Sequence, residues 1–167
     1  MRTLLGVPAL CVLVAAAMPQ AQTAGSGKVD SQWKCAAPSP VHALPVGDAA
    51  GHAYVVQQAK CTATKGEIAG VKEKDGTSTE FMEASGNEAK GHGIFVETLA
   101  NGDTITISYT FTGMSSNDVL ESGSNKWTVA GGTGKLKGMK GSGTCSGKGA
   151  GDGSAVFDCT GTYTLAQ

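Results

Sequence analysis

Two cysteines stand symmetrically about a glycine-flanked aspartate near the end of this chain. Cys145 lies seven residues before Asp152 and Cys159 lies seven residues after it. In an antiparallel hairpin that folds at Asp152, residues whose numbers sum to 304 face each other, and the two cysteines meet this condition. Facing residues on antiparallel strands lie close enough for a disulfide. The spacing therefore predicts a β fold, a strand register and an oxidising compartment.

The first residues have the layout of a secretory signal peptide. Arg2 supplies one positive charge, and the run from Leu4 to Met18 is apolar apart from small residues. Cleavage fits the small residues Ala15 to Ala17, or a position near Thr23. We expect residues 1–23 to be removed, which leaves a secreted or periplasmic protein. The apolar run is short and rich in alanine, and no later stretch is long enough to span a bilayer.

Four cysteines remain after cleavage, because Cys11 lies inside the leader. Four cysteines allow three pairings. The hairpin symmetry favours Cys145–Cys159, which leaves Cys35–Cys61. A thiol or metal site is the alternative. The chain has no C-x-x-C motif and no histidine close to a cysteine in sequence, so we predict two disulfides and no metal.

The charge composition argues against one class of partner. Arg2 is the only arginine, so the mature chain has 12 lysines against 14 carboxylates. Recognition of phosphate groups by paired hydrogen bonds normally relies on arginine. Nucleic acid is therefore not an expected partner.

Alternation of apolar and hydroxylic residues marks the clearest strand. Between Thr104 and Phe111, apolar residues occupy every second position and threonine or serine the others, which predicts one face turned to the core. Asn101-Gly102, just before this run, predicts a tight hairpin. Asp75-Gly76 likewise predicts a turn between two earlier strands. The inward residues expected from this run are Ile105, Ile107, Tyr109 and Phe111.

Similar runs recur from Gly51 onward and predict about eight strands in a mostly sequential antiparallel order. Short turns at this chain length favour an all-β fold with a single small antiparallel β-barrel, because closure removes exposed edges. A two-sheet sandwich is the alternative. We assign residues 51–167 to the barrel domain and residues 24–50 to a flexible N-terminal arm. This arm includes Trp33. The stretch from Ala21 to Lys34, which overlaps the beginning of the arm, is expected to be disordered.

A glycine-rich segment invites comparison with nucleotide-binding loops. The run Gly131-Gly132-Thr133-Gly134-Lys135 lacks the spacing G-x-x-x-x-G-K-[ST]. The dinucleotide spacing G-x-G-x-x-G also fails, because Gly138 comes one residue late. We therefore predict no nucleotide and no other cofactor.

The same segment carries a family resemblance. WTVAGGTGKLKGMKG, from Trp127 to Gly141, resembles the T-V-x-G-G-T/S-G-x-F/L-x-G-x-x-G segment of the allene oxide cyclase and dirigent-like barrels. In those families it forms a strand, a turn packed by one apolar residue (here Leu136) and the next strand. A looser resemblance spans Gly51 to Tyr163, and Gly91-His92-Gly93 with Asn101-Gly102-Asp103 resembles uncharacterised exported bacterial members. The resemblance implies a calycin-like barrel and a trimer.

Candidate site residues follow from the expected strand faces. Tyr109, Phe111 and Trp127 are expected to line part of the barrel interior, and His92 is expected at a polar rim. Such a wall suits a small apolar ligand, for example a fatty-acid or terpenoid-like compound. Strand glutamates usually face water, and an inward carboxylate is the alternative for Glu80, Glu83 and Glu97.

Two functional classes follow. The first is an exported noncatalytic barrel that binds a small apolar molecule or another envelope component. The second is a cyclase or isomerase-like enzyme of the allene oxide cyclase or dirigent type, which steers a reactive ligand by cavity shape. The sequence contains no metal motif, cofactor fingerprint or nucleophile triad, so we favour the first class. An apolar pocket with buried carboxylates would favour the enzyme, and a filled interior would favour an interaction role.

Overall fold

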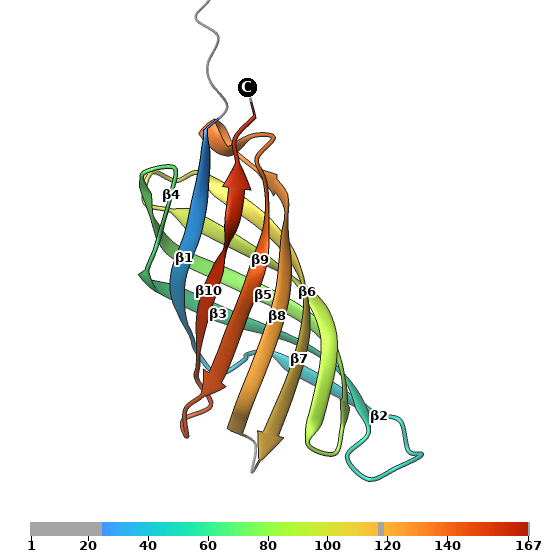
Figure 1. Ribbon diagram of the computed structural model, residues 1–167. Coiled ribbons are helices and arrows are strands. Elements are labelled where there is room, and N and C mark those ends of the chain that lie inside the picture. Colours follow the sequence, from blue (N-terminus) through green and yellow to red (C-terminus); the bar gives the residue numbers. More distant parts are fainter. Residues whose placement is uncertain (1–24, 117–118, 167) are drawn as a thin grey trace, which may run out of the picture.

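Eight long antiparallel strands close into one barrel (Figure 1). The computed structural model describes residues 25–116 and 119–166, so the expected signal peptide lies outside the described residues. Around the ring the order is β1, β10, β9, β8, β7, β6, β5 and β3, and β3 pairs again with β1. The predicted all-β barrel is confirmed. The elements are β1 (Ser26–Cys35), β2 (Val41–Pro45), β3 (Ala53–Lys65), β4 (Glu67–Ile68), β5 (Val71–Ser85), β6 (Glu88–Leu99), β7 (Thr104–Ser116), β8 (Val119–Gly132), η1 (Gly134–Leu136), β9 (Lys140–Gly149) and β10 (Ala155–Thr164).

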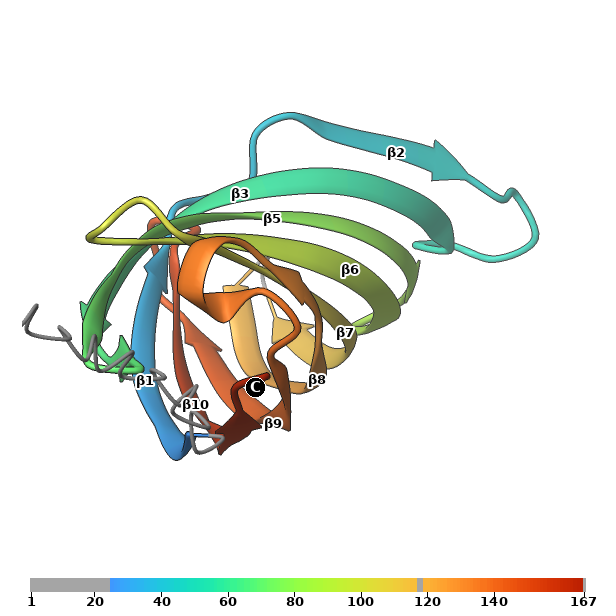
Figure 2. The ribbon, with the colours of Figure 1, turned by 90° about the horizontal axis from the view of Figure 1, so that it is seen from above.

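Two short strands are added to this ring. β2 pairs with the beginning of β3, from Val41 opposite Gln57 to Pro45 opposite Ala53, and all its residues are exposed. Figure 2 shows β2 lying outside the ring, beside β3. β4 pairs with the start of β5. No helix in the described part of the chain has the length and apolar character needed to cross a membrane.

The hairpin of β9 and β10 has the predicted register. Cys145 faces Cys159, and the paired residues from Ala155 and Gly149 to Thr164 and Lys140 all sum to 304. The two cysteines form a disulfide. A second disulfide joins Cys35 of β1 to Cys61 of β3, which also face each other. Both predicted pairings are confirmed.

The turn at Asn101-Gly102 is also confirmed. The amide of Gly102 donates to the Leu99 carbonyl over 2.9 Å, and the amide of Leu99 donates to the Asp103 carbonyl over 2.9 Å. Gly102 has φ 88°, the left-handed conformation required at the end of a three-residue hairpin loop. The turn sets the register of β7, whose apolar face lies inward as expected: Ile105, Tyr109 and Phe111 are buried, and Ile107 packs against them.

The predicted flexible arm over residues 24–50 is wrong in its first part. β1 pairs along its whole length with β10 and closes the barrel against β3. Trp33 is 5% exposed and packs in the interior. The inward positions of β1 include Val29 and Ser31 as well as Trp33, and a serine interrupts the apolar alternation. Hydrogen bonds to strands on both sides stabilise β1, and these long-range pairings leave no signal in the local sequence.

The predicted turn at Asp75-Gly76 is also wrong. β5 continues through both residues, and the chain reverses earlier, at Ala69 and Gly70, which have φ 52° and 77°. The pairing of β5 with β6 shifts register between Glu73 and Asp75. Such a bulge changes which residues face inward. Inward positions are therefore odd-numbered up to Glu73 and even-numbered from Gly76 onward.

Glycines in β9 and β10 make room for one large ring in the core. Trp127 of β8 lies over Gly143 of β9 and Gly161 of β10, and a Cβ atom at either glycine would come within about 2.5 Å of the Trp127 ring. That approach is closer than van der Waals contact allows. Trp127 therefore fills the space of two missing side chains, and glycine within these strands permits the close approach.

Candidate functional site

The barrel encloses a cavity of about 570 Å³. One end of the cavity is formed by Ile68 and Met139, which belong to the same buried cluster as Leu136 of the η1 turn. At the other end the cavity reaches two loops, represented by Pro38 and Gly153, and Leu120 at the start of β8. The two loops lie toward the lower end of the barrel in Figure 1. The volume falls within the range of small-molecule sites, and the lining is mainly apolar and aromatic.

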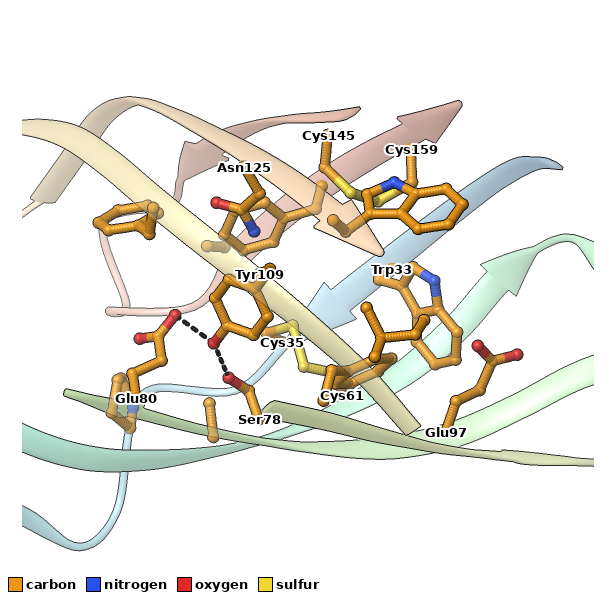
Figure 3. Close-up of a pocket in the computed structure, with 18 of the residues that line it drawn as sticks. Trp33, Cys35, Cys61, Ser78, Glu80, Glu97, Tyr109, Asn125, Cys145 and Cys159 are labelled. Carbon is orange, nitrogen blue, oxygen red and sulfur yellow. Dashed lines mark hydrogen bonds between the residues drawn. A yellow bond between two sulfur atoms is a disulfide. The ribbon is translucent and has the colours of Figure 1, made fainter. Parts of the chain in front are cut away.

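A tyrosine and a glutamate meet inside this cavity (Figure 3). Tyr109 of β7 donates its hydroxyl hydrogen to Oε1 of Glu80 on β5 over 2.6 Å. The Ser78 hydroxyl lies 2.5 Å from the Tyr109 oxygen, and Nε2 of Gln57 donates to Oε2 of Glu80 over 2.9 Å. Burial, and then the charge of Glu80, raise the pKa of Tyr109. The phenol therefore stays protonated and orients the carboxylate.

Two further carboxyl groups of the cavity lining are buried, one on β5 and one on β6. Glu73 of β5 is 8% exposed and Glu97 of β6 is 2% exposed. Ser31 of β1 donates its hydroxyl hydrogen to Oε1 of Glu73 over 2.7 Å. Burial raises the pKa of both carboxyls, and the neighbouring charge of Glu73 raises the pKa of Glu97 further. The pair therefore retains a proton at pH values where exposed glutamates are ionised.

Four buried polar atoms of the cavity lining accept or donate no hydrogen bond within the described residues, apart from the one that joins the two carboxyls: Oε2 of Glu73, Oε1 of Glu97, Oδ1 of Asn125 and Nε1 of Trp127. All four residues line the cavity. Buried polar atoms are normally satisfied by protein, ordered water or a ligand. The cavity therefore offers an incoming molecule both acceptors and an indole donor.

Three of the four predicted ligand-contacting residues lie on the cavity wall. Tyr109, Phe111 and Trp127 are buried and face inward, while their role in binding stays a prediction. His92 is placed differently from the expectation. It is exposed on the outer face of β6, where its ring lies 5.8 Å from that of Phe81. His92 occupies an outward position of a strand rather than a rim, so it cannot contact a ligand in the cavity.

Alternation along the strands can locate some of the other polar residues of the cavity, but not all of them. Asn125 shares the strand parity of Trp127, so alternation along β8 could have placed it inside. Glu80 and Glu97 stood among the strand glutamates with an inward alternative, and both point inward. Glu73 could not be found in this way, because the bulge in β5 interrupts the alternation.

Both disulfides lie on the cavity wall, and all four cysteines contribute to it. Cys35–Cys61 joins β1 to β3, where the barrel closes, and Cys145–Cys159 joins β9 to β10. A crosslink at the closing seam resists opening of the ring. No group of three or more histidines, cysteines, aspartates or glutamates within the described residues could hold a metal ion.

No protein-family model and no curated protein sequence matches this chain. Among solved structures, it is similar to the pterocarpan synthase dirigent protein GePTS1, with 13% identity and a TM-score of 0.50 over 94% of this chain and 100% of that one. It is similar to the pterocarpan synthase dirigent protein PsPTS1 at 13% identity and a TM-score of 0.50, over 86% and 97% of the two chains. A β-barrel-like protein from Acinetobacter baumannii matches at 13% identity and a TM-score of 0.49, over 88% and 100%. The first two likenesses show a dirigent-like barrel fold, and at these identities they show the fold alone.

Proposed function

We propose that this protein binds a small, mainly apolar molecule inside its barrel. The observation that carries the proposal is the mainly apolar cavity of about 570 Å³ with a few polar atoms on its wall. A filled interior would favour an interaction role with another envelope component, and the cavity argues against that. Aromatic and aliphatic side chains supply the binding free energy, and the polar atoms orient the ligand.

A fluorescence titration tests this proposal, because Trp33 and Trp127 both line the cavity. Octanol, a neutral apolar probe, should change the emission saturably. The substitution Ala59→Phe places a ring in the cavity and should abolish the response. The matched change Ala43→Phe adds the same ring to the exposed strand β2 and should leave it intact. A response that survives Ala59→Phe would place octanol outside the cavity.

A second candidate function is an enzyme that steers a reactive ligand, as the resemblance to the cyclase and dirigent barrels implies. One observation favours it: Glu97 is buried in the cavity with a raised pKa, which suits a carboxyl group that donates a proton to a ligand. Incubation with a terpenoid epoxide, followed by mass spectrometry of the products, tests this function. Isomerised product that Glu97→Gln abolishes would support it, and unchanged epoxide would leave only binding.

We further infer that the protein is exported and that residues 1–23 are removed as a signal peptide. Two disulfides fit an oxidising compartment. The same proposal includes a relationship to exported bacterial barrels and the trimer that the family resemblance implies. Terminal sequencing of the native protein tests the cleavage, and native mass spectrometry tests the trimer. An intact leader or a monomer would overturn the corresponding part.

A further inference from the structure

The charged groups of the cavity all have one sign. The described lining residues include three glutamates, Glu73, Glu80 and Glu97, and no lysine, arginine or histidine. A carboxylate ligand would meet the charge of Glu80 and no counter-charge among the described lining residues, which costs free energy in an environment of low dielectric constant. The fatty-acid probes suggested by the sequence are therefore a poor match to this interior.

The three glutamates differ in the hydrogen bonds that they already accept. Glu80 accepts hydrogen bonds at both oxygens, from Tyr109 and Gln57. The pair formed by Glu73 and Glu97 accepts one hydrogen bond from outside, from the Ser31 hydroxyl, and the two carboxyls hydrogen-bond to each other through the proton they retain. Oε2 of Glu73 and Oε1 of Glu97 accept from no other described group. A buried carboxylate without a donor or counter-charge is costly. The pair is therefore the place where an added cation would gain most.

Aromatic rings lie next to this pair. Trp33 contacts Phe95 edge to face, with ring centroids 4.9 Å apart, and Figure 3 shows the Trp33 ring beside Glu97. Phe95 precedes Glu97 by two residues on β6, so both face the cavity. The faces of aromatic rings attract cations, and their area packs against apolar chains. The surroundings of the pair thus suit a positive group attached to an apolar body.

We propose, on the basis of the proposed function, that the ligand is a hydrophobic amine whose ammonium group binds the Glu73–Glu97 pair. An ammonium group has three hydrogen atoms to donate, and Oε2 of Glu73 and Oε1 of Glu97 accept from no other described group once the proton they share has left. The apolar part of the molecule extends along the cavity toward Tyr109. As the cation binds, the proton retained by the two carboxyls leaves for solvent, because the ammonium charge stabilises both ionised groups.

Three probes with the same alkyl chain test this proposal by calorimetry near neutral pH: octylamine, octanol and octanoate. We expect octylamine to bind about tenfold more tightly than octanol or better, and octanoate to bind most weakly. The double substitution Glu73→Gln and Glu97→Gln should remove the advantage of octylamine and leave octanol binding intact. Glu121→Gln, on the exposed face of β8, is the matched control and should change none of the three affinities.

A second measurement does not depend on the folding of the double variant. Titrations of the unaltered protein in buffers of different ionisation enthalpy should show protons released with octylamine and none with octanol. Octanol binding as tightly as octylamine, or octylamine binding without proton release, would overturn the amine assignment while the proposed function stands. Failure of all three probes to bind in the cavity would overturn the proposed function as well.

Discussion

Tyr109 and Glu80 hydrogen-bond across an intervening strand, because the residue between them is glycine. Gly93 of β6 pairs with Tyr109 on one side and with Glu80 on the other. The Tyr109 side chain passes over Gly93 and reaches Oε1 of Glu80 at 2.6 Å. A Cβ atom at Gly93 would lie 2.5 Å from the tyrosine oxygen, so the contact depends on that glycine.

We expect Gly93→Ala to break this hydrogen bond. The added methyl group would also lie 2.7 Å from the Thr79 carbonyl oxygen, so neither the ring nor the backbone has room. The variant should lose about 1 to 3 kcal/mol of unfolding free energy in urea. Gly131→Ala is the matched control, because its Cβ would meet no atom within 4 Å. Equal losses from both changes would contradict this account of Gly93.

Removal of the Tyr109 hydroxyl should also destabilise the protein. Tyr109→Phe leaves Glu80 with one donor fewer in a partly buried site, and we expect a loss of about 1 to 3 kcal/mol. Tyr54→Phe is the control, since Tyr54 is 41% exposed. Urea unfolding of both variants near neutral pH measures the difference. A Tyr109→Phe protein as stable as the Tyr54→Phe protein would mean that the hydrogen bond contributes nothing measurable.

The Glu73–Glu97 pair should make stability fall as pH rises. Their pKa values lie above the ordinary 4.5 in the folded state, so the folded chain holds protons that the unfolded chain has already released. Below pH 4.5 the pair is protonated in both the folded and the unfolded state and costs no stability. Above this pH the free energy of unfolding decreases until the pH exceeds the raised pKa values of the pair.

We therefore expect Glu97→Gln to stabilise the protein at neutral pH and to have little effect under acidic conditions. Melting temperatures of both proteins across the pH range measure the difference. Glu121→Gln, an exposed change, should give no such pH-dependent gain. A gain that is the same at all pH values would rule out titration of the pair as its cause.

Both disulfides should contribute to stability. The Cys145–Cys159 bond closes a loop with a sequence separation of 14, and its replacement by serines should cost about 3 kcal/mol in the chain-entropy model. Cys35–Cys61, with a separation of 26, should cost slightly more. Non-reducing peptide mapping of the purified protein should yield these two linked peptides. Free thiols, or a peptide joining Cys61 to Cys145, would contradict the pairing.

Local patterns predicted the parts of this fold that local chemistry determines. The turn at Asn101-Gly102, the inward face of β7 and the register around Asp152 depend on residues close together in sequence, and all three are confirmed. The strand character of β1 depends on pairing with β10 and β3, which are distant in sequence. Ser31 also interrupts the apolar alternation of β1, so its local pattern does not predict a strand.

The site was predictable to the same extent. Alternation along β7 and β8 places Tyr109, Phe111 and Trp127 inside, but it cannot locate Glu73, because a bulge in β5 reverses the alternation. His92 shows the opposite error. His92 is expected at a polar rim, but Gly91 and Gly93 on either side of it lie within β6, so His92 occupies the middle of a strand. Gly93 has no side chain and leaves room for the Tyr109 ring.

The most direct test of the central claim is to locate a bound apolar molecule by amide and indole NMR. Octanol should shift the indole signals of Trp33 and Trp127 saturably, because both rings line the cavity. Amides around Phe81 and His92, on the outer face, should stay unchanged. Saturable shifts at the two indoles are the expected result. Shifts confined to the outer face, or none at any octanol concentration below its solubility limit, would contradict the account of a ligand-binding barrel.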